Sequence, residues 1–416
     1  MEECVVARLG RTKPQSVFSR TSLHTISIPQ IILSQICVPN RSLFRIDGAK
    51  RYSLALVAAL VFAFALPGIA AAPPALCYTK AADDPKPAQA ENITSPCQAL
   101  KGQLKNDPDN VALHEEMTRC LFDARLQAAF KEGNGSEKVK EIVKVLADHV
   151  LWLVQHAPGG DFDDNPGRII DAYSYPEDHE RIKREWLKQV EAQPGNAKVL
   201  AHAANFLSGG EDLERGRELA AKAHSLDPQE ADVSLLLAHL EELQTIRAGP
   251  QEKTQLAKQA FRLREEALNS LSGNQRFSEL PYAAKAAIKA GDMLKAQDYA
   301  EEMLRLAPTT KDWGNGEQIY YGNWTLGLIA LNKGNMEEAK TRLLEAGKTP
   351  GSPVLGSFGP NMELARQLIE KHETEAVLKF FDECEKFWKR GHDNLNRWRG
   401  DVNQGKMPEF GANLNY

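Results

Sequence analysis

The chain has 416 residues, and its 51 Lys and Arg against 56 Asp and Glu give a formal charge of −5. Hydrophobic residues make up 42% and charged residues 26%, which is ordinary for a soluble protein. This composition excludes collagen, a polytopic membrane protein, a disulfide-dense miniprotein and a wholly disordered chain. The near-neutral balance provides no broad cationic face, so we expect no nucleic-acid partner. The length fits two or three domains or one long repeat array.

The first 72 residues read as targeting sequence. Residues 1–48 are rich in Arg and Ser and lack any period, which predicts a disordered extension; either the assigned start lies upstream of the true one, or a transit peptide precedes a second signal. Residues 49–72 combine two basic residues, an apolar run over Leu54–Leu66 and a small-residue end, as signal peptides do. This signal predicts a periplasmic or secreted protein. The alternative is membrane anchoring through 54–72, which would leave an inner-membrane-anchored protein facing the periplasm.

A linker and a helical body follow this region. Residues 73–92 are rich in Pro and Ala and have no apolar period, which is typical of a linker. Beyond them apolar residues recur at helical spacing, and no long stretch alternates with the period of a strand. We therefore expect an all-α body, with helices that include Val111–Phe130, Glu137–His156, Tyr175–Ala192 and Glu252–Leu271.

The body contains an internal repeat built around turns at Glu211, Gly291 and Gly334. Small residues recur seven positions before and five positions after each turn, namely Ala204 and Gly216, Ala284 and Ala296, and Gly327 and Ala339. In a helix hairpin such positions lie where the two helices touch, and a bulky side chain there would force the axes apart. A Gly followed by Asp or Asn suits the reversal, because it supplies a positive φ and then an N-cap.

This pattern resembles the tetratricopeptide repeat, in a degenerate form. The turns at Gly291 and Gly334 are 43 residues apart, more than the roughly 34 residues of that repeat, and its consensus Trp and Tyr are mostly missing. The resemblance implies an α-solenoid of helix hairpins over 93–373, followed by capping helices and a tail over 374–416. It also implies that the first helix of each pair lines a concave binding face.

A second resemblance covers residues from about 160 to 416. The stretches that carry it are similar to a family of exported or sigma-factor-associated bacterial proteins, and they are Asn165–Asp171, Gly322–Gly327, Gly351–Met362 and Met407–Tyr416. This resemblance implies a shared architecture and no reaction.

Metal motifs are incomplete. Asp161–Gly167 has the acidic spacing of a calcium loop, but Pro166 and Ala172 stand where Gly and Glu are needed. His149 and His156 are seven positions apart, without an HExxH pattern or an evident third ligand. We expect no bound metal and interpret the acidic segment as a solvated turn.

Cofactor and catalytic motifs are incomplete as well. Gly351 and Gly356 have the spacing of a phosphate loop, but Ser357 and Phe358 stand where Lys and Ser or Thr would hold the phosphates. The sequence contains no G-x-S-x-G motif and no Cys and His pair in a family context. We expect no cofactor and no enzymatic activity.

Four cysteines remain after export, namely Cys77, Cys97, Cys120 and Cys384. An oxidising compartment would permit a Cys97–Cys120 disulfide between neighbouring helices. Burial as free thiols is an equal alternative, because Cys packs as a small hydrophobe.

Aromatic residues supply the candidate partner site. Tyr320, Tyr321 and Trp324 lie within about one helical turn, and Tyr321 and Trp324 take concave-face positions in the repeat; a role in the core is the alternative. The aromatic set from Phe380 to Trp398 is interpreted as core. The Gly-, Ser- and Pro-rich loop that follows contributes Ser357, Phe358 and Asn361, although its apolar residues could instead plug a hairpin interface.

The functional hypothesis is an exported scaffold that binds a protein or peptide partner on its concave face. One alternative is a small-ligand binder or enzyme that uses the 351–361 loop with the nearby tyrosines, and it predicts a pocket there. The other alternative is a purely structural element, which predicts a flat and wholly polar concave surface.

Overall fold

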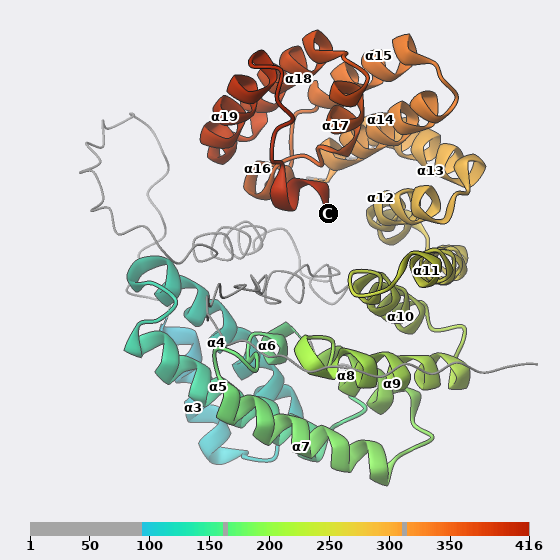
Figure 1. Cartoon of the computed structure of the whole chain (residues 1–416). Helices are drawn as coiled ribbons and strands as arrows, with labels where there is room; N and C mark the ends of the chain where they lie inside the picture. The colour runs from blue at the N-terminus through green and yellow to red at the C-terminus, as the bar shows by residue number, and fades with distance from the viewer. Residues whose placement is uncertain (1–93, 161–164, 310–313, 416) are drawn as a thin grey trace, which may run out of the picture.

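The computed structural model describes residues 94–160, 165–309 and 314–415 (Figure 1). Every regular element within these ranges is a helix, which confirms the all-α prediction. The predicted extension 1–48, signal 49–72 and linker 73–92 lie outside the described residues, as does the acidic turn over 161–164. No helix within the described ranges has both the length and the apolar character needed to cross a membrane.

The helices follow one another along a continuous array. The first part comprises α3 (Thr94–Asn106), α4 (Val111–Glu132), α5 (Glu137–His156), α6 (Asn165–Arg168), α7 (Pro176–Ala192), α8 (Ala197–Phe206) and α9 (Leu213–Leu226). The second part comprises α10 (Ala231–Gln244), α11 (Pro250–Ser270), α12 (Gly273–Ala290), α13 (Met293–Leu306), α14 (Asn315–Asn332), α15 (Met336–Gly347), α16 (Pro353–Phe358), α17 (Glu363–Glu370), α18 (Thr374–Phe387) and α19 (His392–Asn403).

Neighbours in sequence are neighbours in space, as in an α-solenoid. The most extensive packing joins α4 to α5, α8 to α9, α10 to α11, α12 to α13 and α14 to α15. Figure 1 shows the ribbon bending into an open arc, with α12, α14 and α17 on its inner side and α13, α15 and α18 on its outer side. The array therefore presents its helices in two layers, and the inner layer forms the concave face.

Small residues lie at the hairpin contacts, as the repeat predicts. A Cβ on Gly216 would stand 2.9 Å from the carbonyl oxygen of Leu207 and 3.1 Å from that of Ala204. Ala284 and Ala296 are fully buried between α12 and α13. Gly327 closely approaches Arg342 of α15 and, beyond the prediction, Leu364 of α17.

The turns use the expected capping chemistry in two of the three copies. Gly291 and Gly334 have φ of 83° and 75°, and the next residues, Asp292 and Asn335, accept the backbone N–H three positions on. The first copy differs, because its turn runs through a short 3₁₀ helix over Gly210–Asp212 with no left-handed residue.

A disulfide joins Cys97 of α3 to Cys120 of α4. It closes a loop with a sequence separation of 23 residues at the start of the described array. The buried Cys384 is a free thiol. The structure thus selects the disulfide from the two alternatives that the sequence left open.

Replacing both bridged cysteines by Ser should lower the free energy of unfolding by about 3 kcal/mol, because the reduced chain regains the entropy of a loop of this length. Thermal unfolding of the double variant should match that of the wild type in reductant. The variant Cys384→Ala serves as the comparison without a bridge. Equal stability of the oxidised and reduced wild type would contradict this expectation.

The aromatic residues near the end form the core of the cap, as expected. Phe380, Phe381 and Trp398 are at most 1% exposed, and Phe410 of the tail packs with its ring centroid 5.0 Å from that of Trp398. The Trp398 indole donates to the carbonyl oxygen of Glu409 at 3.0 Å. The tail therefore folds back onto the array and closes its last hydrophobic layer.

Candidate functional site

A groove of about 540 Å³ lies on the inner side of the arc, and we call it the inner groove. Its walls are formed by α12, the start of α13, α14, α17 with its flanking residues, and the C-terminal tail. The lining residues are Lys285, Ile288, Lys289, Met293, Trp324, Leu328, Leu331, Asn332, Asn361, Glu363, Gln367, Lys371, Leu414 and Asn415. Three inner helices therefore share one surface.

Equivalent positions of the repeat supply the floor. Lys285 stands six residues before the turn at Gly291, and Leu328 stands six before the turn at Gly334. Ile288 and Leu331 each stand three residues before their turn, and Lys289 and Asn332 each stand two residues before it. Since residues spaced by three or four share one face of a helix, α12 and α14 present the same face to the groove.

A side-chain bond fixes α14 beside α12. Pro281 lies inside α12 and has no N–H, so it cannot donate to the carbonyl oxygen of Phe277 one turn earlier. The amide of Gln318 in α14 donates to that oxygen instead, at 2.8 Å. The gap in the α12 ladder is thereby filled by the neighbouring inner helix, which sets the spacing of the two walls.

Lys285 lies against two aromatic rings. Its ammonium stands 4.7 Å from the ring centroid of Tyr282 and 4.4 Å from that of Tyr321. Burial, and then the charge of Lys289, lowers the pKa of Lys285 to about 8, although the cation–π contacts favour its charged form. Within the described ranges no carboxylate forms an ion pair with it, although the charges of Glu317 and Glu242 act on it from a longer distance and also favour its charged form.

Trp324 contributes an unused donor. Its side chain is 5% exposed and packs edge-on against Tyr321, with ring centroids 6.0 Å apart. The indole Nε1 is buried, and within the described part of the chain it has no hydrogen-bond partner. A buried donor without an acceptor costs free energy, which a ligand acceptor could recover.

The third wall begins at Asn361, just before α17. The carbonyl oxygen of Asn361 accepts from the Tyr320 hydroxyl at 2.6 Å, and its side-chain oxygen accepts from the backbone of Glu363 at 2.9 Å. Glu363 in turn receives the Arg366 guanidinium at 2.6 and 2.9 Å. The only carboxylate among the residues that line the inner groove is thus already neutralised.

The six predicted partner-binding residues do not lie together in the structure. Trp324 and Asn361 lie together in the inner groove. Tyr321 is 3% exposed and acts as a support, since its ring contacts both Lys285 and Trp324. Tyr320 is fully buried, because its ring packs near Phe380 and its hydroxyl is bonded, so the alternative of a core role holds for this residue.

The remaining two predicted residues do not line the groove. Ser357 and Phe358 belong to α16, a short helix where the sequence suggested a loop. Gly351 and Gly359, on either side of it, pack closely against Phe387 and Trp388 of the cap. Only Asn361 of the 351–361 segment reaches the groove, so most of this segment has a packing role, as the plug interpretation expects.

The lysines and leucines of the groove were not among the residues predicted from the sequence. Taken singly, a lysine such as Lys285, Lys289 or Lys371 carries no signal of binding, because most lysines lie on a solvated surface. The signal that could have found them was their common offset from the repeat turns, since it places Lys285 and Leu328 on one face.

Replacing Tyr320 by Phe should lower the free energy of unfolding by about 1 kcal/mol, because it removes a buried hydrogen bond from the hydroxyl to the carbonyl oxygen of Asn361. Denaturant unfolding of Tyr320→Phe measures this difference. The matched control is Tyr173→Phe, because the Tyr173 side chain is 78% exposed. Equal losses in the two variants would show that the hydroxyl does not secure the third wall.

No known family model matches the chain, and no curated protein sequence matches it. Over the described ranges, no group of three His, Cys, Asp or Glu side chains is placed to hold a metal ion. The inner groove therefore has to be interpreted from its own chemistry.

Proposed function

We propose that this protein is an exported scaffold of the tetratricopeptide type, and that its inner groove binds a segment of a partner protein or peptide. The observation that carries the proposal is the use of equivalent repeat positions on consecutive inner helices to line one groove. Such a surface repeats along its length and suits an extended chain.

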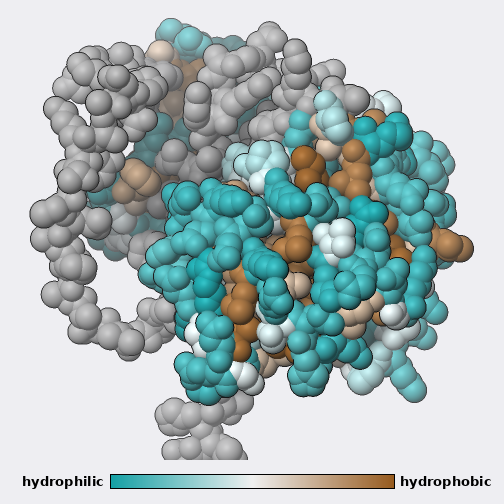
Figure 2. Space-filling view, turned by 90° about the horizontal axis from the view of Figure 1, so that it is seen from above, coloured by the Kyte–Doolittle hydropathy of each residue, from teal (hydrophilic) through white to brown (hydrophobic). Residues whose placement is uncertain are grey.

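The mixed character of the groove supports binding over a purely structural role. Leu328, Leu331 and Leu414 provide apolar contact, and Asn361 and Gln367 provide amides. A structural element alone predicts a flat and wholly polar inner surface. Elsewhere, the part of the chain that the structure describes is mainly hydrophilic on the face seen in Figure 2, with hydrophobic residues in narrow strips.

The proposed export rests on the signal pattern of residues 49–72 and agrees with the Cys97–Cys120 bridge. Disulfides persist in oxidising compartments and are rare in the cytosol. Fractionation of the producing cell, with N-terminal sequencing of the product, tests the export. A cytosolic product that begins at Met1 would contradict it.

The binding proposal can be tested by selection from a random peptide library displayed on phage. Peptides selected on the purified protein should lose at least about tenfold in affinity on Leu331→Gln, which places an amide in the half-buried apolar floor. The control Leu294→Gln changes the same residue type at a position 77% exposed outside the groove. If no selected peptide depends on Leu331, the proposal fails.

A further inference from the structure

Three lysines line the inner groove, namely Lys285, Lys289 and Lys371. Lysines elsewhere include paired ones, such as Lys295 with Glu265 at 2.6 Å and Lys340 with Glu373 at 3.1 Å, and others, such as Lys222, that form no ion pair among the described residues. Lys285, Lys289 and Lys371 form no ion pair among the described residues. The groove thus concentrates positive charge in a chain whose formal charge is −5.

The hydrogen-bond donors of the groove are also in excess. The Lys285 ammonium rests on two ring faces, which provide no oxygen acceptor for its protons. The Trp324 Nε1 is a buried donor without a partner in the described structure. Both side chains line the groove and contact Tyr321.

We infer that the partner segment is acidic, with carboxylates facing Lys285, Lys289, Lys371 and the Trp324 Nε1, and with apolar side chains resting on Leu328 and Leu331. This inference rests on the proposed function and names the chemistry of the partner. An ionised carboxylate offers acceptors and no donor, so it complements a surface that offers donors in excess.

The shape of the groove favours a peptide over a small anion. The three lysines come from α12 and from the end of α17, and α14 inserts an apolar strip and the indole between them. An inorganic anion could contact one of these cations but would leave the apolar strip of α14 uncovered. An extended chain that carries both acidic and apolar residues can meet both features, because it places some side chains beside the lysines and others on the strip.

The test uses fluorescence anisotropy with three labelled peptides and the purified full chain. The acidic peptide alternates Glu and Leu, and two matched peptides carry Gln or Lys in place of Glu. We expect the acidic peptide to bind at least about tenfold more tightly than the Gln peptide. The advantage should shrink as salt is raised, because exposed Lys289 and Lys371 are screened.

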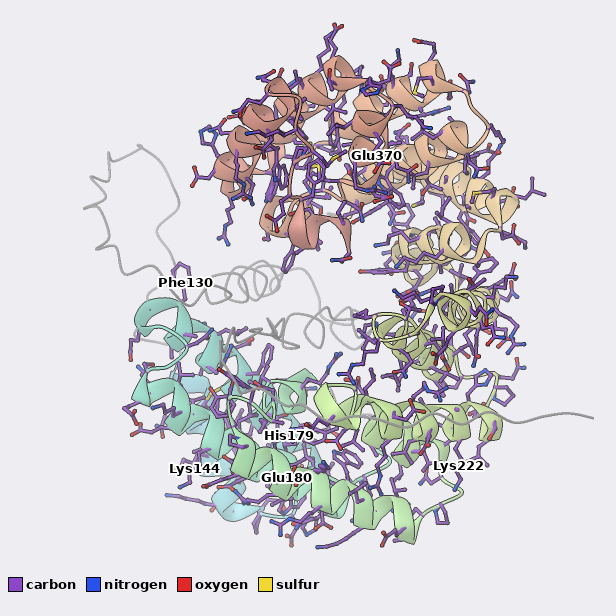
Figure 3. All side chains as sticks on the ribbon, in the orientation of Figure 1. Phe130, Lys144, His179, Glu180, Lys222 and Glu370 are labelled. Atoms are coloured by element: carbon purple, nitrogen blue, oxygen red, sulfur yellow. A yellow bond between two sulfur atoms is a disulfide. The ribbon has the colours of Figure 1, made fainter. Side chains whose placement is uncertain are left out.

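Two substitutions address the donors directly. Lys285→Gln should weaken the acidic peptide about tenfold and leave the Gln peptide nearly unchanged. Trp324→Phe keeps a buried ring but removes the indole N–H, and it should weaken the acidic peptide about fivefold. The control is Lys222→Gln on α9, where Figure 3 shows Lys222 far along the arc from α17. Circular dichroism of each variant verifies that the fold is kept.

The outcomes separate this inference from the function on which it rests. Equal binding of the acidic and Gln peptides, or an acidic preference that survives Lys285→Gln, overturns the inference. Complete displacement by inorganic phosphate, with no need for Leu in the peptide, overturns it as well. If library peptides depend on Leu331 but carry no acidic residues, the proposed function stands and the inference falls. If no peptide depends on the groove, both fall.

Discussion

Replacing Gly316 by Ala is expected to lower the free energy of unfolding by about 3 kcal/mol. Gly316 lies in the first turn of α14, and a Cβ there would collide with the carbonyl group of Gly351. The obstacle is backbone, which cannot rotate away as a side chain can. It is also held from behind, because Gly351 packs against Phe387 and the Thr349 hydroxyl donates to the Gly316 carbonyl at 2.6 Å.

The matched control is Gly400→Ala in α19, where an added Cβ would meet no atom within 4 Å. The same chemical change should there stabilise the protein by about 0.5–1 kcal/mol, because Ala loses less backbone entropy than Gly in a helix. Urea unfolding of the two variants measures the contrast. Similar midpoints would mean that the segment before α16 is free to move away from α14.

The helices and hairpin contacts could be predicted because their causes are local. The predicted helix Glu137–His156 coincides with α5, since Ser136 caps its start and the apolar stripe runs its whole length. The contact at Gly216 was visible in the spacing of small residues around the turn. Periodicity and capping are written in neighbouring residues, so no tertiary information was needed.

The short helix α16 also had a local signal, which the loop interpretation outweighed. The Ser352 hydroxyl accepts the backbone N–H of Leu355 at 3.1 Å, and Pro353 stands at the first helical position. Both are common at helix starts. The abundance of Gly and Pro in the segment reflects its close packing against Phe387 and Trp388.

The candidate site could be predicted only in part, because its chemistry depends on residues far apart in sequence. Trp324 and Asn361 were identified, but Tyr320 has the same local pattern as Tyr321 and lies in the core. What separates them is the partner of each ring, Phe380 for Tyr320 and Lys285 for Tyr321. The meeting of α12, α14 and α17 decides those partners, and no single segment encodes it.

Replacing Arg264 by Met is expected to lower the free energy of unfolding by about 3 kcal/mol. Arg264 is 2% exposed, and its guanidinium binds both oxygens of Glu242 at 2.7 and 2.8 Å and approaches Glu279 at 3.5 Å. These residues come from α10, α11 and α12, so the cluster ties one hairpin to the next. Removing one member of a buried ion pair leaves the other charge unpaired, and a quarter of the Glu242 side chain remains in contact with water to soften the loss.

Two comparisons isolate the buried charge as the cause. Arg262→Met removes an arginine from the same helix, but the Arg262 side chain is 70% exposed and its ion pair with Glu266 has a distance of 3.7 Å. The free energy of unfolding should therefore change by no more than about 0.5 kcal/mol. Adding Glu242→Gln to Arg264→Met should recover part of the loss, because it removes the carboxylate that was left unpaired. No recovery would assign the loss to packing of the arginine stem.

The same cluster predicts how the cost of Arg264→Met depends on pH. Burial opposes the charge of Glu242, but Arg264 outweighs it and lowers the pKa of Glu242 from 4.5 to about 2. Because the folded pKa lies below the unfolded one, this carboxylate stabilises the wild type fully above about pH 4.5 and loses its effect as the pH falls toward 2. Without Arg264, burial raises the pKa of Glu242, so the ionised carboxylate does not stabilise the variant at neutral pH. The difference in unfolding free energy should therefore be largest near neutrality and shrink at about pH 3, and a difference that stays constant in acid would place the stabilising charge elsewhere.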